Sequence, residues 1–316
     1  MTDKITDLDR IGAGLRATFP ELCVVTPLCV LGEGFHSLAV ETGDGHVFRV
    51  ARNREATEGQ AREAALLPAL HAWLPVAIPE PRWHAGPSEH FPFGVIGYAK
   101  VPGIPLDPSR LTQANLYGVA SALAAFLHAL HRFPAADALA AGVPGHDARG
   151  VRLEALRADA LPSLRCALSR DEYRSVERWW GEILSDPAMA LKAPVLCHGD
   201  LWYENVLVDD ACRTVTGIVD FEAANVGDPA QDFATLRHLG NLATGAVIKA
   251  YCALGGRLDA TFAHRLQRYW ELREFEGIRF AVVHADEDEV ADVLRKLRGG
   301  AVLDPAAHPR LPIAGC

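Results

Sequence analysis

Short segments that alternate or run apolar dominate the first hundred residues, which is typical of β-strands. They are CVVTPLCVLGEG, SLAVETGDGHVFRVAR and FPFGVIGYAK, and the GDG at 43–45 indicates a hairpin turn. An opening helix precedes these strands. Apolar residues at helical spacing predict one more helix over 56–74, which the prolines of LPVAIPEP end.

After residue 111 the spacing of apolar residues becomes mostly helical. Predicted helices cover 111–133, 151–168 and 169–186, and several more follow the region of strands at 193–199, 204–209 and 214–221. Proline and glycine accumulate in YAKVPGIPLDP, where the strand pattern is lost. We therefore predict an α+β chain with a small antiparallel-sheet lobe over 1–100, a hinge near 99–103 and a larger, mainly helical lobe over 101–316.

Composition narrows the class of protein. The net charge of −9 argues against nucleic acid as a partner, because phosphate binding needs a basic face. The N-terminal MTDKITDLDR lacks the apolar segment of a signal peptide, and no apolar run reaches the ~20 residues that span a bilayer. We therefore expect a cytoplasmic protein with no membrane partner. The seven cysteines show no zinc spacing and predict reduced thiols.

Two neighbouring segments concentrate polar residues next to apolar strands. Residues 198–205 read HGDLWYEN, and residues 217–233 read GIVDFEAANVGDPAQDF. Phosphoryl transfer needs a carboxylate that accepts the proton of the attacking hydroxyl and oxygen ligands that hold Mg²⁺ against the phosphates. Asp200, Asn205 and Asp220 have the spacing that kinase-type sites use for these parts. The alternative is that all three are turn, cap or strand-end residues.

These segments resemble the aminoglycoside phosphotransferase family, which has a protein-kinase-like two-lobed fold. LGEGFHSLAVE resembles the family's nucleotide-positioning loop, HVFRV its third strand, GYAKVPGIPL its hinge, and RYWELREFEG the substrate-facing helix of the 2''-type enzymes. The resemblance implies a catalytic core over about 104–135 and 190–240, and helical substrate-binding parts over about 136–189 and 241–316.

The resemblance also implies residue roles. Asp200 would be the catalytic base, and Asn205 and Asp220 would be the Mg²⁺ ligands. Asp228 and Asp232 would brace the metal loop, and His198 is expected to orient the catalytic loop by hydrogen bonding. The donor would be ATP or GTP, held by nucleotide-binding residues from the sheet lobe and hinge: Gly32, Gly34, Ser37, Arg49, Glu63, Tyr98, Ala99 and Val101.

The sheet lobe departs from the family pattern at two places. GEGFHS lacks the third glycine of a G-x-G-x-x-G loop, and Arg49 stands where the family has a lysine. Arg49 keeps a positive charge for the phosphates and is expected to pair with Glu63, although the two cations differ in shape. Its alternative is a surface strand residue. Tyr98 precedes the hinge, and its bulk is expected to narrow the nucleobase pocket and favour GTP over ATP.

The acceptor predicted by the resemblance is a small cationic hydroxylated molecule, in the first place an aminoglycoside, which implies a role in antibiotic resistance. Glu271 and Glu274, beside Trp270, share a helix face that would bind amino groups, and Glu204 would add to an acidic cleft. The alternatives are a solvated face for these glutamates, a macrolide or small metabolite such as choline or a sugar as acceptor, and a nucleotide-binding pseudokinase without chemistry. A monomer is expected.

Overall fold

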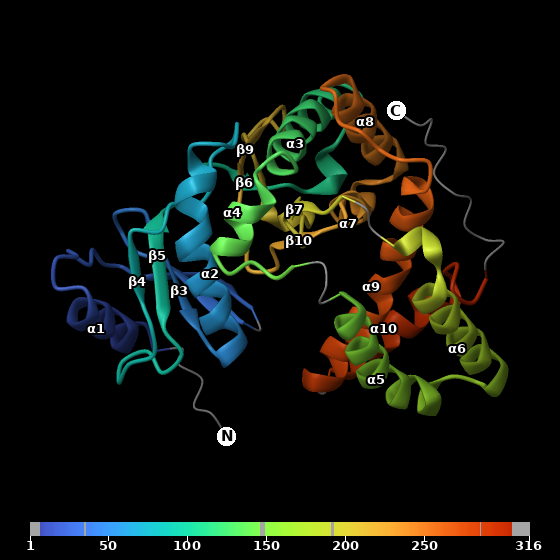
Figure 1. Cartoon of the computed structure of the whole chain (residues 1–316). Helices are drawn as coiled ribbons and strands as arrows, with labels where there is room; N and C mark the ends of the chain where they lie inside the picture. Colours follow the sequence, from blue (N-terminus) through green and yellow to red (C-terminus); the bar gives the residue numbers. More distant parts are fainter. Residues whose placement is uncertain (1–6, 35, 146–148, 191–192, 285, 305–316) are drawn as a thin grey trace.

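The computed structural model describes residues 7–34, 36–145, 149–190, 193–284 and 286–304. A five-stranded sheet with its helices lies at one side of the molecule, and a larger, mainly helical part lies at the other (Figure 1). The α+β, kinase-like fold predicted from the sequence is confirmed. The division of the chain at residue 100 into two lobes stays a prediction. The first residues of the predicted small lobe, 1–6, and the last residues of the predicted large lobe, 305–316, lie outside the described residues.

The sheet of the small lobe is antiparallel throughout, in the order β1-β2-β3-β5-β4. Its strands are β1 Cys29–Glu33, β2 Ser37–Glu41, β3 His46–Ala51, β4 Trp83–Ala85 and β5 Val95–Ala99. Side chains alternate between the two faces of a strand. Phe48 and Val50 of β3 therefore pack on the side of α1 (Leu8–Thr18), in a cluster with Ile11 and Leu15, while Arg49 points to the opposite side.

Helix α2 (Arg54–His71) covers that opposite side and joins the small lobe to the rest. Asn53 begins it by accepting a hydrogen bond from the backbone N–H of Ala56. Leu66, Leu67 and Leu70 belong to the same buried cluster as the long helix α3 (Leu116–Leu130). The helix that carries Glu63 is thereby anchored to both parts of the molecule.

Short strands outside the small lobe form two further sheets. Strands β6 (Ile104–Pro105), β8 (Val206–Val208) and β9 (Val215–Ile218) form one antiparallel sheet, and β7 (Val195–Cys197) pairs with β10 (Asn225–Gly227). The hinge fits tightly over β9. Gly103 has φ +119°, and a Cβ there would lie 2.2 Å from the hydroxyl oxygen of Thr216, so only glycine fits.

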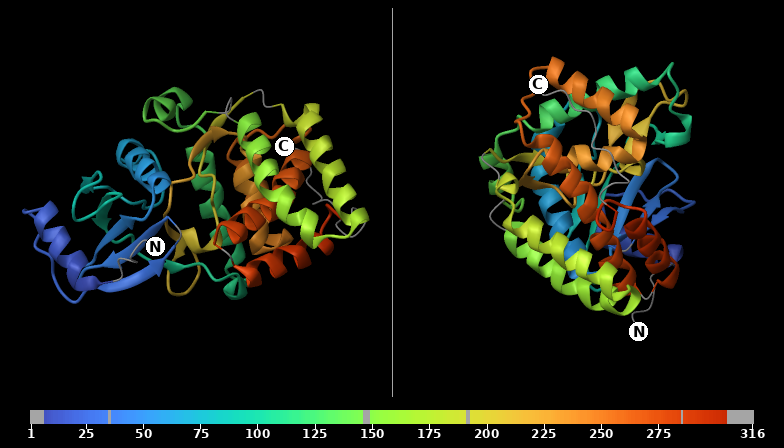
Figure 2. Two further views of the ribbon diagram at one scale, coloured as in Figure 1. Left: turned by 90° about the horizontal axis from the view of Figure 1, so that it is seen from below. Right: turned by 90° about the vertical axis from the view of Figure 1, so that its right-hand side faces the viewer.

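The helices of the larger part form two groups. Helices α3, α4 (Ala135–Ala140), α7 (Ala230–Thr235) and α8 (Asn241–Ala253) surround the short strands. A second cluster of buried apolar residues holds α5 (Arg149–Ala167), α6 (Arg170–Ser185), α9 (Phe262–His284) and α10 (Glu287–Arg298) together (Figure 2). Four 3₁₀ turns complete the description: Pro108–Arg110, Pro187–Met189, Tyr203–Asn205 and Leu236–Leu239.

Several elements differ from the sequence expectations. The predicted helix over 111–133 begins only at Leu116, and α4 and the strands β4, β6 and β10 were not predicted. These strands have two or three residues each, too few for alternation to be recognised. Five of the cysteines are free, but Cys252 is disulfide-bonded, so the prediction of reduced thiols is wrong there. None of the described helices combines the length and apolarity needed to cross a membrane.

Candidate active site

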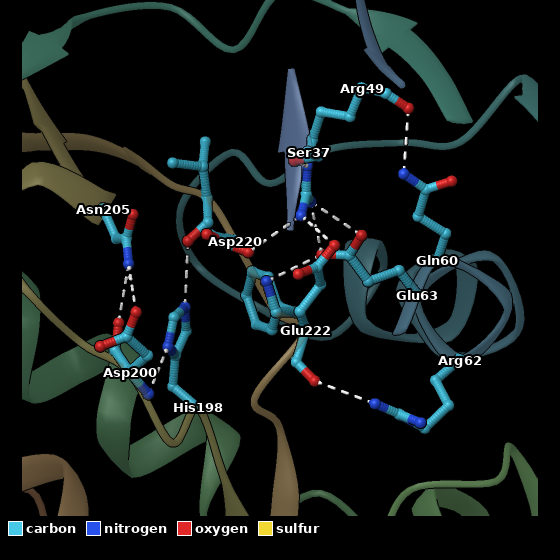
Figure 3. Close-up of polar contacts among 12 residues, drawn as sticks. Ser37, Arg49, Gln60, Arg62, Glu63, His198, Asp200, Asn205, Asp220 and Glu222 are labelled. Carbon is cyan, nitrogen blue, oxygen red and sulfur yellow. Dashed lines mark hydrogen bonds and ion pairs between the residues drawn. The ribbon is translucent and has the colours of Figure 1, made fainter. Parts of the chain in front are cut away.

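The loop after β7 holds His198, Asp200 and Asn205 in one hydrogen-bonded turn (Figure 3). The amide nitrogen of Asn205 donates to the backbone oxygen of Asp200 at 2.9 Å and to its Oδ2 at 3.2 Å. The ring of His198 lies against Phe221, accepts from the backbone N–H of Asp200 at 3.3 Å and contacts the carbonyl oxygen of Val219 at 3.1 Å. His198 therefore ties this loop to the segment that carries Asp220.

Buried Asp232 fixes the backbone of the same loop from below. Its two carboxylate oxygens accept hydrogen bonds from the backbone N–H groups of His198 at 3.0 Å and Gly199 at 2.9 Å. His131 of α3 contacts Oδ2 of Asp232 at 3.1 Å, and its other ring nitrogen meets the Tyr251 hydroxyl. Asp232 contributes no atom to the cleft, since it is fully buried.

Asp228 is also buried and belongs to an ion pair. Its Oδ2 accepts from Nε of Arg265 on α9 at 2.6 Å, while its Oδ1 accepts from the backbone N–H of Ala230 and so begins α7. This pair links the GDP turn to α9. Both Asp228 and Asp232 are fully buried and bonded within the protein, as a bracing role would require.

Asp220 follows β9 in a backbone conformation that few residues other than glycine adopt, with φ +66°. Its neighbour Val219 donates a backbone hydrogen bond to Asn205 at 3.0 Å, so the two loops are joined directly beside both side chains. Gly199 packs equally closely on this segment, because a Cβ there would lie 2.2 Å from the carbonyl oxygen of Ala223. Asp200, Asn205 and Asp220 are thus brought together on one support.

Arg49 lies at the centre of three carboxylates (Figure 3). Its guanidinium makes two hydrogen bonds to Glu63, at 2.8 and 3.0 Å, and its other terminal nitrogen lies 3.1 Å from Asp220 and 2.5 Å from Glu222. Only 6% of Arg49 is exposed, so a surface role is excluded. A planar guanidinium can bridge three carboxylates in this way, whereas a lysine has one donor atom.

The electrostatics of this cluster follow from burial among acids. Loss of bulk water, opposed by Arg49 and assisted by the negative charges of Asp220 and Glu63, raises the pKa of Glu222 to about 7. Asp200 keeps a solvent-accessible surface, yet the surrounding protein and the negative charge of Asp220 raise the pKa of its carboxyl, against the effect of His198. A carboxylate with a raised pKa is a better proton acceptor.

The other predicted nucleotide residues line the same edge of the sheet or the hinge. Gly32 lies in β1, where an added Cβ would meet nothing within 4 Å, and at Gly34 it would meet only the carbonyl oxygen of Ser37. The protein's own packing therefore leaves space above this hairpin. Tyr98 is buried near Arg49, and burial raises its pKa strongly. Ala99 ends β5, and buried Val101 packs on Gly217.

The side chains of Asn205 and Asp220 fit a hard divalent cation. The Asn205 amide nitrogen donates to Asp200, which leaves its oxygen free to act as a ligand, and Asp220 supplies a carboxylate. Oxygen donors of these two types are those that Mg²⁺ takes in proteins. Arg49 pairs with one Asp220 oxygen, so the second remains for an ion.

A cavity of about 540 Å³ opens next to this cluster. It begins at Gly199, the residue before Asp200, and extends between α2, α5, α7 and α9. Trp270 of α9 lines it, and its predicted contact with a substrate stays a prediction. Trp270 also contacts His238, which meets Trp202 of the loop after β7 edge-to-face at a centroid distance of 3.7 Å. A continuous row of rings therefore connects the loop with α9.

The predicted acidic face of α9 does not line this cavity. Glu271 is 7% exposed and accepts hydrogen bonds from Trp179 at 2.7 Å, Gln267 and Arg268, and it borders a separate hollow beside α6. Glu274 is 9% exposed and pairs with Arg273 at 2.6 Å. Neither is the solvated residue of the alternative hypothesis. Glu204 is exposed on the loop and does not line the cavity either.

Comparison with known proteins identifies the class of this site. Residues 28–278 match the phosphotransferase enzyme family. The chain belongs to that family. The resemblance found in the sequence motifs is therefore confirmed, and the matched segment includes both loops, the Arg49 cluster and Trp270.

Individual relatives act on different acceptors. The chain is 29% identical over 273 residues to a viomycin phosphotransferase from Streptomyces vinaceus, covering 84% of this chain and 90% of the relative. Among solved structures, the GDP and kanamycin complex of APH(2")-IIia has a TM-score of 0.82, 23% identity and coverage of 91% and 97% of the two chains. A macrolide 2'-phosphotransferase type I has a TM-score of 0.70, 24% identity and coverage of 93% and 97%.

Sequence reasoning missed the charged residues that do line the cavity. They are Glu55, Arg62, Arg152, Glu222, Arg273, Glu276 and Arg279. The spacing of α9 held a usable signal, because Trp270, Arg273 and Glu276 are three apart and share a face. Glu271 and Glu274 follow the neighbouring face, next to buried Leu272 and Phe275.

Proposed function

We propose that this phosphotransferase moves the γ-phosphoryl group of ATP or GTP to a hydroxyl of a small acceptor, with Asp200 as the catalytic base. The observation that carries the proposal is the junction of the two loops. The amide nitrogen of Asn205 donates a hydrogen bond to Asp200, and the backbone oxygen of Asn205 accepts one from the backbone N–H of Val219, the residue before Asp220. The residues that we propose as the base and the two cation ligands therefore lie on joined loops, next to a cavity that Gly199 lines and to the buried Arg49.

In this reaction the acceptor oxygen forms a bond to the γ-phosphorus while the bond from that phosphorus to the β–γ bridging oxygen breaks. The nucleoside diphosphate leaves, and the hydroxyl proton passes to the Asp200 carboxylate and then to solvent. Positioning and charge neutralisation account for most of the catalysis of such transfers. Asp232 and His198 hold the loop in place, and Arg49 offers a fixed positive charge.

Asn205 and Asp220 would hold Mg²⁺, which when bound neutralises charge on the phosphates. Arg49 contacts Asp220 from the small-lobe side, so it lies where both the cation and the phosphates can be reached. The hairpin of Gly32 and Gly34 would cover the phosphates, and Tyr98, Ala99 and Val101 would form the base pocket. A narrow pocket at Tyr98 is the basis for proposing GTP as the preferred donor.

The acceptor class is less closely fixed by the chain's own residues. The relatives are phosphotransferases of aminoglycosides, macrolides and viomycin, so these are the first acceptors to test, and a role in antibiotic resistance in the cytoplasm accompanies them as a prediction. The two glutamates on which an aminoglycoside was predicted are buried and paired elsewhere. The main argument from the sequence for a polycationic acceptor therefore no longer holds.

A nucleotide-consumption assay tests the proposal. Purified protein is mixed with Mg²⁺ and either ATP or GTP, first alone and then with panels of aminoglycosides, macrolides and small hydroxylated metabolites. Consumption that depends on an acceptor and stops in Asp200→Asn supports the transferase. Nucleotide binding without consumption in any panel would instead indicate a pseudokinase. The salt bridge between Arg49 and Asp220 would then be part of its nucleotide-binding site.

A further inference from the structure

The cavity beside Asp200 is rich in arginine. Four arginines line it, Arg62 from α2, Arg152 from α5, and Arg273 and Arg279 from α9, against three glutamates, Glu55, Glu222 and Glu276. Two of these charges are already used. Glu222 pairs with Arg49 at 2.5 Å, and Arg273 pairs with Glu274 at 2.6 Å. Arg62 also donates a hydrogen bond to the backbone oxygen of Glu222 at 3.4 Å, so Arg152, Arg279, Glu55 and Glu276 remain available to a ligand.

The remaining charges are unevenly placed. Glu55 is on α2, whereas the opposite wall of α5 and α9 carries Arg152 and Arg279 with only Glu276 between them. In the part of the chain that the structure describes, neither arginine forms a hydrogen bond or an ion pair. The positive charges of Arg279, Arg152 and Arg273 all act on Glu276, although enclosure by protein is the larger effect and raises its pKa.

The single negative charge of Glu276 balances only one of the two guanidinium charges. Each guanidinium presents a planar fork of donors that matches the two oxygens of a carboxylate or phosphate. The guanidinium carbon of Arg273 lies 3.4 Å from the centre of the Trp270 ring in the same wall, and the exposed side chains of Arg152 and Arg279 border the hollow. A polycationic acceptor would bring like charges to this wall, which disfavours binding.

We propose that the acceptor carries an anionic group, a carboxylate or a phosphate, which Arg152 and Arg279 bind while its hydroxyl faces Asp200. This inference rests on the proposed phosphotransfer and names the chemical class of its acceptor. The apolar part of the wall, Leu153, Leu156 and Leu272, suits the carbon skeleton between the two groups. Glu276 leaves room for one cationic group, so an acidic or zwitterionic molecule fits and a polycation does not.

Anion binding is tested directly on protein saturated with Mg²⁺ and ADP, so that the nucleotide site is filled. Succinate serves as the carboxylate probe and inorganic phosphate as the phosphate probe, each titrated while the melting temperature is recorded. Wild-type protein, Arg152→Gln, Arg279→Gln and the double variant are compared. Arg157→Gln is the matched control, because Arg157 lies on the same helix, pairs with Glu154 and does not line the cavity.

We expect one of the two probes to raise the melting temperature of the wild type and of Arg157→Gln. The apparent affinity should fall about tenfold for each cavity arginine removed, as for the loss of a charge-assisted hydrogen bond. Response to succinate or to phosphate identifies which anion is preferred. Equal responses of the wild type and the double variant, including no response in either, would overturn the inference.

Acceptor kinetics separate this inference from the proposed function. Hydroxy acids, hydroxylated amino acids and sugar phosphates are compared with aminoglycosides in the nucleotide-consumption assay, and the double variant should raise the KM of an anionic acceptor about 100-fold. If aminoglycosides are phosphorylated equally well by wild type and double variant, the transferase stands and the anionic acceptor is rejected. If no nucleotide is bound at all, the proposed function itself fails.

Discussion

In the described part of the chain, charged side chains are paired around Arg49 of the small lobe and largely unpaired on the cavity wall formed by α5 and α9. On the wall of the small lobe, Arg49 is surrounded by Glu63, Asp220 and Glu222 at 2.5–3.1 Å. On the wall of α5 and α9, Arg152, Arg279 and Glu276 face a hollow without ion pairs among the described residues. Buried charges have to be paired, as those around Arg49 are, whereas the exposed side chains of Arg152, Arg279 and Glu276 can stay unpaired and remain available to a ligand. The first arrangement is fixed by the protein itself, and the second is the one that we propose an acceptor completes.

Replacing the catalytic base should have the largest effect. Asp200→Asn keeps the side-chain shape but removes proton acceptance, so turnover should fall about 10²- to 10⁴-fold. Nucleotide affinity, measured by equilibrium binding, should stay within about threefold, since Asp200 does not belong to the Arg49 cluster. Asp210→Asn, in the exposed turn after β8, is the control and should behave as wild type. Near-normal turnover in Asp200→Asn would show that the base assignment is wrong.

Breaking the paired wall should cost both stability and activity. Arg49→Ala leaves buried Glu63 without its partner, which should lower the free energy of unfolding by about 3–5 kcal/mol. kcat/KM for the nucleotide should fall about 100-fold with the loss of a fixed positive charge.

Denaturant unfolding and initial rates check both expectations for Arg49→Ala. Arg49→Lys keeps the charge, so it should recover part of the activity but not the stability. Arg82→Ala, an exposed arginine of the same lobe, is the control. Unchanged nucleotide affinity and turnover in Arg49→Ala would remove its proposed role.

A smaller effect is expected from the base pocket. Tyr98→Ala should widen the pocket and reduce the ratio of kcat/KM for GTP to that for ATP, by roughly tenfold or less. Tyr98→Phe removes only the hydroxyl beside Arg49 and should keep the ratio. Initial rates with each nucleotide at limiting concentration measure it. Equal efficiency with both nucleotides in wild-type protein would reject the proposed preference.

Removing a charge from the wall of α5 and α9 should stabilise the protein, whereas removing Arg49 should destabilise it. Enclosure raises the pKa of Glu276 above its ordinary value of 4.5, so ionising it disfavours the folded state. Glu276→Gln should therefore raise the melting temperature near pH 7, by only about 1–3 °C because the side chain retains contact with solvent.

The size of the Glu276 effect changes with pH, but its sign does not. Below about pH 4 the carboxyl is protonated in both folded and unfolded chains, so the gain of Glu276→Gln should vanish there. The gain should grow as pH rises from the ordinary pKa of 4.5 to the raised pKa of the folded chain, and stay constant above it. Thermal melts of both proteins from about pH 4 to 8 follow this course. A variant less stable than wild type at neutral pH would mean that Glu276 is satisfied by its neighbours.

The contrast between the walls also explains what the sequence could reveal. Asp200, Asn205 and Asp220 lie on short loops between strands, where fixed spacing in the chain becomes fixed distance in space. Arg49 and Glu63 follow from a strand next to a helix, and their pairing was predicted and is confirmed. Glu222 was not recognised as a third partner, because the motif does not say which way its side chain points.

The acceptor wall could not be predicted with the same success, because it depends on how α5, α6 and α9 pack. Glu271 and Glu274 have the composition of a substrate face, but α9 packs so that Glu271 accepts from Trp179 and Glu274 pairs with Arg273, and neither lines the cavity. Arg152 and Arg279 come from helices far apart in the chain, and no local motif connects them. Only a three-dimensional arrangement shows that they share one hollow.

The transfer of phosphate to an acceptor hydroxyl is the central claim, and following the γ-phosphate tests it most directly. ATP or GTP labelled at the γ-position is incubated with Mg²⁺, the protein and the acceptor that gives the highest nucleotide consumption, and the products are separated and identified by mass. The label should appear on the acceptor as a phosphate ester, in an amount equal to the diphosphate released, and Asp200→Asn should form none. Label found only as inorganic phosphate, or equal ester formation by the variant, would contradict the account.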